Sequence, residues 1–149
     1  MDYCAQITSP HMKYNIKILE DIQRRATKLA SQIRKKSYEE RLKIFCISTL
    51  EDRRTRGDLI QMYKIAHNLE IINWVTPINW KKSRILDSSM KSGRNHQFRV
   101  EREYAIKNNA RHEFILNRIS NKWNSLNPSI VNAPSVNSFK NKLDSSLFN

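Results

Sequence analysis

Three short groups of basic side chains are the residues of this sequence whose spacing points most directly to chemistry. Each group lies within one or two turns of a predicted helix. The groups are Arg24, Arg25 and Lys28; Arg34, Lys35 and Lys36; and Arg53 and Arg54. Cations at this spacing can reach successive phosphates, so we predict that these residues bind nucleic acid. Arg53 and Arg54 directly follow Glu51 and Asp52, so local ion pairs are the competing interpretation of that group.

The whole chain shares this positive charge. Its 149 residues include 27 Lys and Arg against 14 Asp and Glu, a net charge of +13. Residues 1–75 carry 14 basic and 9 acidic side chains (net +5), and residues 76–149 carry 13 and 5 (net +8). Such an excess favours salt-sensitive, sequence-independent contact with RNA or DNA. The alternative is a basic surface that serves only to keep the protein in solution.

Aromatic residues in the middle of the chain add a second candidate contact. Trp74, Trp80 and Arg84 carry flat groups on which unpaired bases can stack. Burial of both Trp side chains where this segment crosses the core is the more common outcome for tryptophan. Trp123 lies on an apolar helical stripe and is predicted to be core.

The sequence offers little for catalysis. Polymerases and nucleases cluster carboxylates around two divalent ions, whereas the acids here occur singly or as close pairs on segments predicted to be solvated. Cys4 and Cys46 lie far apart, and the four His residues have no companion ligand nearby. We therefore expect no enzyme activity from this chain, no metal, no cofactor and no small-molecule substrate.

The N-terminus and the hydropathy pattern bear on location. No run approaches the roughly 18 apolar residues of a membrane span, and the first residues lack the basic and then apolar order of a signal peptide. We expect no membrane association and an intracellular protein of the cytoplasm, the nucleus or both.

Apolar periodicity predicts a mainly α-helical, single domain of about five helices with a long central loop and little or no strand. A long first helix begins at Ser9-Pro10 and continues through Leu29 to Ile33. Capping boxes at Ser37/Glu40 and Ser48/Glu51 open the next two helices. Helical spacing returns over 114–126 and over 136–147, the latter capped by Ser135; residues 71–96 are a connection, and 97–102 are a weak strand candidate.

The apolar positions of these helices predict the core. It consists of Leu19, Ala26, Leu42, Phe45, Leu59, Tyr63, Ile115, Ile119, Trp123, Phe139 and Leu143.

Several segments, in order, resemble the C-terminal region of the reverse transcriptases of non-long-terminal-repeat (LINE-type or jockey-like) retrotransposons. The closest similarity is the run Ser-Tyr-Glu-Glu-Arg-Leu-Lys at 37–43. The other similar segments are 9–10, 18–20, 23–28, 49–60, 62–65, 93–94, 117–126 and 131–144. The chain departs from the family at Ile7-Thr8, where relatives often have Trp, and over 71–91.

The resemblance implies a non-catalytic fragment of RNA-directed DNA polymerase from the thumb onward, without the Tyr-x-Asp-Asp catalytic turn. Residues 1–70 would be thumb-like helices, 71–108 a loop-rich connection and 109–149 the C-terminal helices. The implied partners are RNA or RNA–DNA hybrid, and the missing polymerase half of a transposable-element protein. The alternatives are a structural helical module that packs against a polymerase body or another protein, and a decayed retroelement reading frame.

Overall fold

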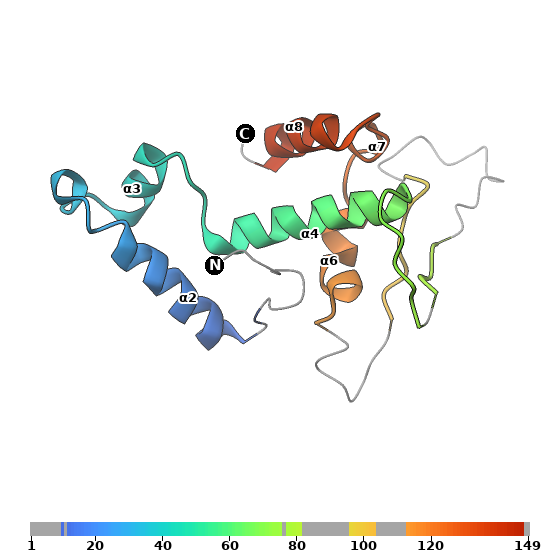
Figure 1. Cartoon of the computed structure of the whole chain (residues 1–149), viewed down its shortest axis with the longest axis horizontal. Coiled ribbons are helices and arrows are strands. Elements are labelled where there is room, and N and C mark those ends of the chain that lie inside the picture. Colours follow the sequence, from blue (N-terminus) through green and yellow to red (C-terminus); the bar gives the residue numbers. More distant parts are fainter. Residues whose placement is uncertain (1–9, 11, 76, 82–95, 104–112, 148–149) are drawn as a thin grey trace. The chain divides into compact units, whose positions relative to one another are not determined.

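The computed structural model describes residues 10, 12–75, 77–81, 96–103 and 113–147. This part of the chain contains six α-helices, one 3-10 helix and one isolated β-bridge (Figure 1). The α-helices are α2 (Lys13–Ala26), α3 (Tyr38–Ile44), α4 (Leu50–Ala66), α6 (Ile115–Asn124), α7 (Pro128–Val131) and α8 (Val136–Leu147). The mainly helical fold class is confirmed, and α7 is the helix that the sequence did not predict.

The chain divides into two compact units, Met1–Gly57 (unit 1) and Asp58–Asn149 (unit 2). Helix α4 contributes to both, because the division falls within it. The glycine inside this helix, Gly57, is the last residue of unit 1. Unit 1 contains α2 and α3, and unit 2 contains α6, α7 and α8.

The predicted capping box of α3 is confirmed. The Ser37 hydroxyl accepts from the backbone N–H of Glu40 at 3.2 Å, and the Glu40 carboxylate accepts from the Ser37 N–H at 2.8 Å. These bonds satisfy backbone donors that have no partner inside the helix. The hydrogen bond from the Ser37 N–H to the carboxylate, and then the interaction of the carboxylate with the Ser37 hydroxyl, lower the pKa of Glu40. The charged form of the carboxylate is therefore favoured.

The second predicted box is shifted by one residue. Thr49, not Ser48, accepts from the N–H of Asp52 at 3.1 Å, and its hydroxyl donates to the Asp52 carboxylate at 2.6 Å. Asp52 therefore takes the place predicted for Glu51. The cap of α8 is confirmed, because the Ser135 hydroxyl accepts from the N–H of Ser138 at 3.2 Å.

The predicted first helix is shorter than its apolar stripe. Helix α2 ends at Ala26, Leu29 is 86% exposed, and Ile33 lies in a short 3-10 helix, Ser31–Ile33. The Thr27 hydroxyl donates to the carbonyl of Arg24 at 3.0 Å, a local bond of the kind that competes with helix continuation. The predicted start at Ser9 lies outside the described residues.

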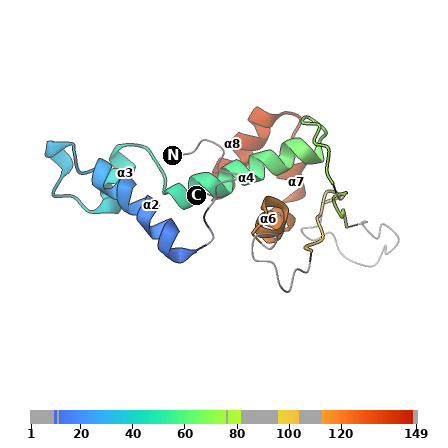
Figure 2. The ribbon, with the colours of Figure 1, turned by 60° about the horizontal axis from the view of Figure 1, so that its bottom comes forward.

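The core of unit 2 is aromatic and tightly packed. Trp123, Phe139 and Leu143 are fully buried, and the Tyr63 ring stacks on Phe139 with centroids 4.4 Å apart. The Tyr63 hydroxyl donates to the carbonyl of Ala133 at 2.6 Å. These contacts tie α4 to α8 and to the turn after α7. Two views of the ribbon show α8 beside α4 (Figures 1 and 2).

Most of the predicted core is confirmed. The confirmed residues are Leu42, Leu59, Tyr63, Ile115, Ile119, Trp123, Phe139 and Leu143. Leu19 is only half-buried. Ala26 and Phe45 are exposed, so their prediction is wrong. Both lie at helix ends, Ala26 as the last residue of α2 and Phe45 as the C-cap of α3.

Residues 96–103 form an extended segment that is fastened by side chains of α6. The Asn124 amide accepts from the N–H of Val100 at 2.9 Å and donates to its carbonyl at 2.8 Å. The Trp123 indole N–H donates to the carbonyl of Phe98 at 2.6 Å. The strand predicted over 97–102 is reduced to a single bridge between Trp80 and Val100.

His96 is buried at the edge of the Trp123 ring, only 3% exposed. Its Nε2 lies 2.9 Å from the carbonyl of Trp123; since a carbonyl only accepts, Nε2 carries the proton. Its Nδ1 has no hydrogen-bond partner among the described residues. Burial, with a smaller repulsion from Arg99, lowers the pKa of His96 against the opposing effect of the Trp123 hydrogen bond.

We therefore expect acid to destabilise unit 2. The unfolded chain binds the His96 proton near pH 6.5, whereas the folded chain binds it only at a lower pH. Stability from the neutral imidazole is complete above about pH 6.5 and falls as pH drops toward the folded pKa, by up to about 1.4 kcal/mol per pH unit. Urea unfolding from pH 7.5 to 5 should show this fall. His96→Phe should make the free energy of unfolding depend less steeply on pH. An equal pH dependence in both proteins would contradict this role of His96.

Candidate nucleic-acid interface

Six of the predicted cations gather on one exposed segment of unit 1. This segment, residues 24–36, begins in the last turn of α2 and ends just before Ser37, the N-cap of α3. Its exposed cations are Arg24, Arg25, Lys28, Arg34, Lys35 and Lys36. The sequence has no acid between Asp21 and Glu39. We call residues 24–36 the basic segment.

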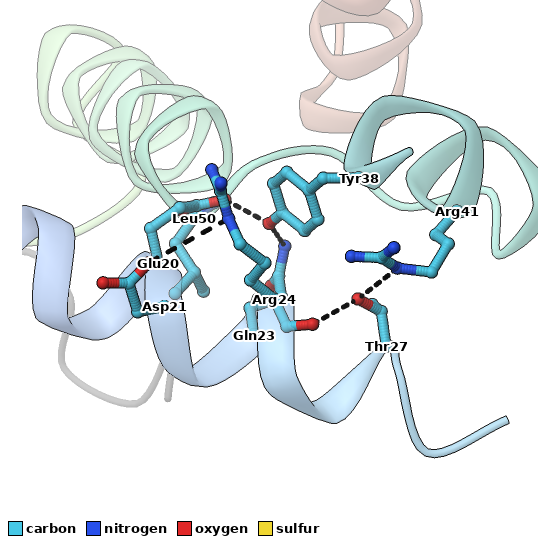
Figure 3. A network of polar contacts seen from close by, with 8 residues as sticks. All are labelled: Glu20, Asp21, Gln23, Arg24, Thr27, Tyr38, Arg41 and Leu50. Atoms are coloured by element: carbon cyan, nitrogen blue, oxygen red, sulfur yellow. Dashed lines mark hydrogen bonds and ion pairs between the residues drawn. The ribbon is translucent and has the colours of Figure 1, made fainter. Parts of the chain in front are cut away.

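Arg41 of α3 fastens both ends of the loop within this segment. Its guanidinium donates from Nε to the Thr27 hydroxyl at 3.2 Å (Figure 3). Its Nη1 donates to the carbonyl of Lys36. The side chain is only 2% exposed. Because a buried guanidinium needs its donors satisfied, residues 27 and 36 are held close to α3. The loop between these two positions carries Lys28, Arg34 and Lys35.

Tyr38 stands beside this clamp at the start of α3. Its ring lies near two guanidinium groups, with 4.6 Å from its centroid to Cζ of Arg24 and 5.7 Å to Cζ of Arg41, distances typical of cation–π contacts. Its hydroxyl donates to the carboxylate of Glu20 and accepts from the Gln23 amide at 3.0 Å (Figure 3). Burial and then the Glu20 hydrogen bond raise the pKa of Tyr38, so the phenol keeps the proton that it donates.

Glu20 and Gln23 connect α2 to the first turn of α4. The other carboxylate oxygen of Glu20 accepts from the N–H of Leu50 at 3.0 Å, the first residue of α4. A carboxylate is stabilising at this position because the first N–H groups of a helix lack partners. The buried Gln23 amide donates to the carbonyl of Ser48 at 3.1 Å and accepts from Arg53. The elements beside the basic segment are thus joined through polar side chains.

The predicted cations do not all share one environment. Arg24 is half-exposed, 3.9 Å from the carboxylate of Asp21, and also faces the Tyr38 ring. Arg53 is half-buried and bonded to Gln23, so it belongs to the internal network. Arg54 is 8% exposed, because it follows the buried Leu50 by one turn on the inward face of α4. We leave Arg53 and Arg54 out of the candidate interface.

Sequence reasoning missed the residues that shape this surface. Arg41 and Gln23 belong to segments that resemble the retrotransposon family, and the sequence assigned no role of its own to either. A polar residue in the buried register of an amphipathic helix is the signal that could have found Gln23, since it lies four residues after Leu19 and four before Thr27.

The central aromatic residues are not deep core. Trp74 is half-buried and meets the ring of Phe114 edge-on, with centroids 6.1 Å apart. Trp80 is 37% exposed and lies near Phe98. Arg84 lies outside the described residues. Trp123 is fully buried, which confirms its prediction.

Comparisons with family models, curated proteins and solved structures find no match to this chain. Within the described ranges, no helix is both long and apolar enough to cross a membrane. Nor do those residues include three or more His, Cys, Asp or Glu side chains placed to hold a metal ion. Cys46 is an exposed free thiol.

Arg41→Met tests the clamp. Methionine preserves an apolar stem but removes the bonds to Thr27 and Lys36, so we expect the free energy of unfolding to fall by about 1–3 kcal/mol. Amide hydrogen exchange over 27–37 should accelerate. Arg25→Met removes the same charge from an exposed position and should change stability by no more than about 0.5 kcal/mol. Equal effects of the two substitutions would show that Arg41 does not hold the loop.

Proposed function

We propose that this chain binds RNA or RNA–DNA hybrid through the basic segment and acts as a non-catalytic nucleic-acid-gripping module. The observation that carries the proposal is the set of six exposed cations between Asp21 and Glu39, without an acid among them. Phosphates are spaced regularly along a nucleic-acid strand, so a cationic surface held on a fixed loop can neutralise several at once.

The clamp gives this surface a physical advantage over a free basic tail. A flexible tail must be ordered on binding, which lowers the affinity obtained from the same charges. Here the Arg41 bonds to Thr27 and Lys36, together with the Ser37 cap, hold the loop before any ligand arrives. The cost of ordering the backbone is then already met by folding.

The sequence resemblance gives the proposal its context. A module that grips template RNA and the primer duplex suits the thumb-proximal, C-terminal part of a non-long-terminal-repeat retrotransposon reverse transcriptase. In that context the catalytic carboxylates would lie on the polymerase half, which we propose as a protein partner. The proposal assigns no catalytic role and no cofactor to this chain.

A helical packing module is the second candidate function. Helix α2 exposes Tyr14, Ile18 and Ile22 at four-residue intervals, 73%, 41% and 41% exposed, so they share one side of the helix. An apolar row of this kind is suited to contact with another protein surface. The salt dependence of binding distinguishes the two candidate functions, because phosphate binding weakens steeply with added salt and apolar packing does not.

The triple substitution of Arg34, Lys35 and Lys36 by Ala tests the proposed function. Each lost phosphate contact lowers the magnitude of the slope of log K against log salt by about 0.7–0.9. We therefore expect a slope reduced by about 2–3, together with weaker binding of single-stranded RNA and RNA–DNA hybrid. Fluorescence anisotropy at several salt concentrations measures both quantities.

The matched control replaces Lys122, Lys140 and Lys142 by Ala, which removes the same net charge from α6 and α8 of unit 2. It should lower the slope by clearly less than the first triple. Equal slopes for the two triples would mean that net charge, not the basic segment, drives binding. If RNA binding by the unaltered chain did not depend on salt concentration, the packing module would be favoured.

A further inference from the structure

Unit 2 contains a cavity of about 350 Å³ beside the central aromatic residues. It lies between residues 73–75 and 77–79, the extended segment 100–103 and the start of α6. Its volume falls within the range of pockets that enclose small organic groups. The basic segment belongs to unit 1, so this cavity is a separate feature.

The walls of the cavity are mainly aromatic and aliphatic. Trp74 and Phe114 both line the cavity and meet edge to face at an interplanar angle of 89°. The aliphatic part of the wall consists of Pro77, Ile78, Val100 and Leu116. Flat apolar surfaces of this kind hold a planar ring by stacking and by dispersion.

The polar lining is a combination of amides and carboxylates. Exposed Asn73, Asn79 and Glu101 contribute to it, and Asn117 holds one wall in place by accepting the N–H of Glu103 at 2.9 Å. An ionised carboxylate only accepts hydrogen bonds and repels phosphate. The lining therefore favours a neutral ring that carries amino donors over an anionic group.

The walls are fixed by bonds that do not involve a ligand. Asn124 holds both backbone groups of Val100, and the N–H of Glu101 donates to the carbonyl of Asn79 at 2.8 Å. The N–H of Lys81 donates to the carbonyl of Arg99 at 2.7 Å. The two sides of the cavity are thereby joined, and the site is formed before binding, as small-molecule pockets usually are.

We propose that this cavity receives one unpaired nucleobase of the bound nucleic acid, stacked on Trp74, with Glu101 accepting from its exocyclic amino group. The inference rests on the proposed function, because it names the part of the ligand that unit 2 holds. Adenine, cytosine and guanine carry an amino group, whereas uracil does not. An unpaired base in a loop or at a strand end can enter such a site, whereas a base inside a duplex is stacked and paired.

The test compares two single-stranded RNA oligonucleotides, one with an adenine and the other with an abasic residue at the same central position, within a uridine tract. The intact oligonucleotide should bind roughly ten-fold more tightly, as expected for one stacked base. Trp74→Ala should remove this difference. Trp80→Ala is the matched control, because Trp80 lies in the same segment but does not line this cavity, and it should retain the difference.

Free nucleosides give a readout that is independent of the basic segment. Adenosine should shift the indole N–H resonance of Trp74 in an NMR titration, uridine should shift it less, and Glu101→Gln should narrow the gap between them. Equal binding of the intact and abasic oligonucleotides, with the steep salt dependence retained, would overturn the nucleobase site and leave the proposed function standing. If the chain bound no RNA but adenosine still shifted the Trp74 resonance, the proposed function would be overturned and the nucleobase site would stand.

Discussion

The buried guanidinium of Arg41 is the constraint on which the candidate interface depends. A cation that is removed from water must have its donors satisfied, and here the partners are neutral oxygens at residues 27 and 36 together with the Tyr38 ring. Satisfying one side chain therefore fixes two backbone positions nine residues apart. The cations between them are presented on a closed loop, not on a free chain.

The two units differ in the kinds of contact that join their helices. In unit 1 the contacts among α2, α3 and the start of α4 pass through Glu20, Gln23, Tyr38 and Arg41, a polar network whose members satisfy one another. In unit 2 the aromatic contacts pass through Tyr63, Trp123 and Phe139, with single hydrogen bonds at the ring edges. Arg118 of α6 also forms an ion pair with Asp58 of α4 at 2.8 Å. Polar networks are specific in geometry but lose more when one member is removed. A surface that must keep cations in place benefits from that specificity.

The sequence predicted most of the fold where local chemistry decides the structure. The caps at Ser37 and Ser135 and the apolar positions of α4, α6 and α8 depend on neighbours three or four residues away, so spacing reveals them. The clamp on Thr27 and the role of Gln23 depend on partners 14 to 30 residues distant. Spacing alone does not contain that information, so the sequence predicted neither the clamp nor the role of Gln23.

The same contrast between local and distant neighbours applies to the candidate site. The identity of the cations could be predicted from the sequence, because clustered charge without acids is a local property. Their arrangement could not, because it requires Arg41 to reach back to Thr27. The cavity beside Trp74 could not be predicted either, since residues 73–75, 77–79, 100–103 and 114–117 meet there only in the folded chain. The only sign of the cavity in the sequence was the pair of tryptophans, Trp74 and Trp80, in the central segment.

The most direct test of the account is an NMR map of the chain on titration with single-stranded RNA at low salt. The account predicts that the amide resonances of residues 24–36 shift together, and that the shifts disappear when salt is raised. Resonances of 24–36 that stay in place while the RNA binds elsewhere, or shifts that persist at high salt, would contradict the claim that this clamped basic loop grips nucleic acid.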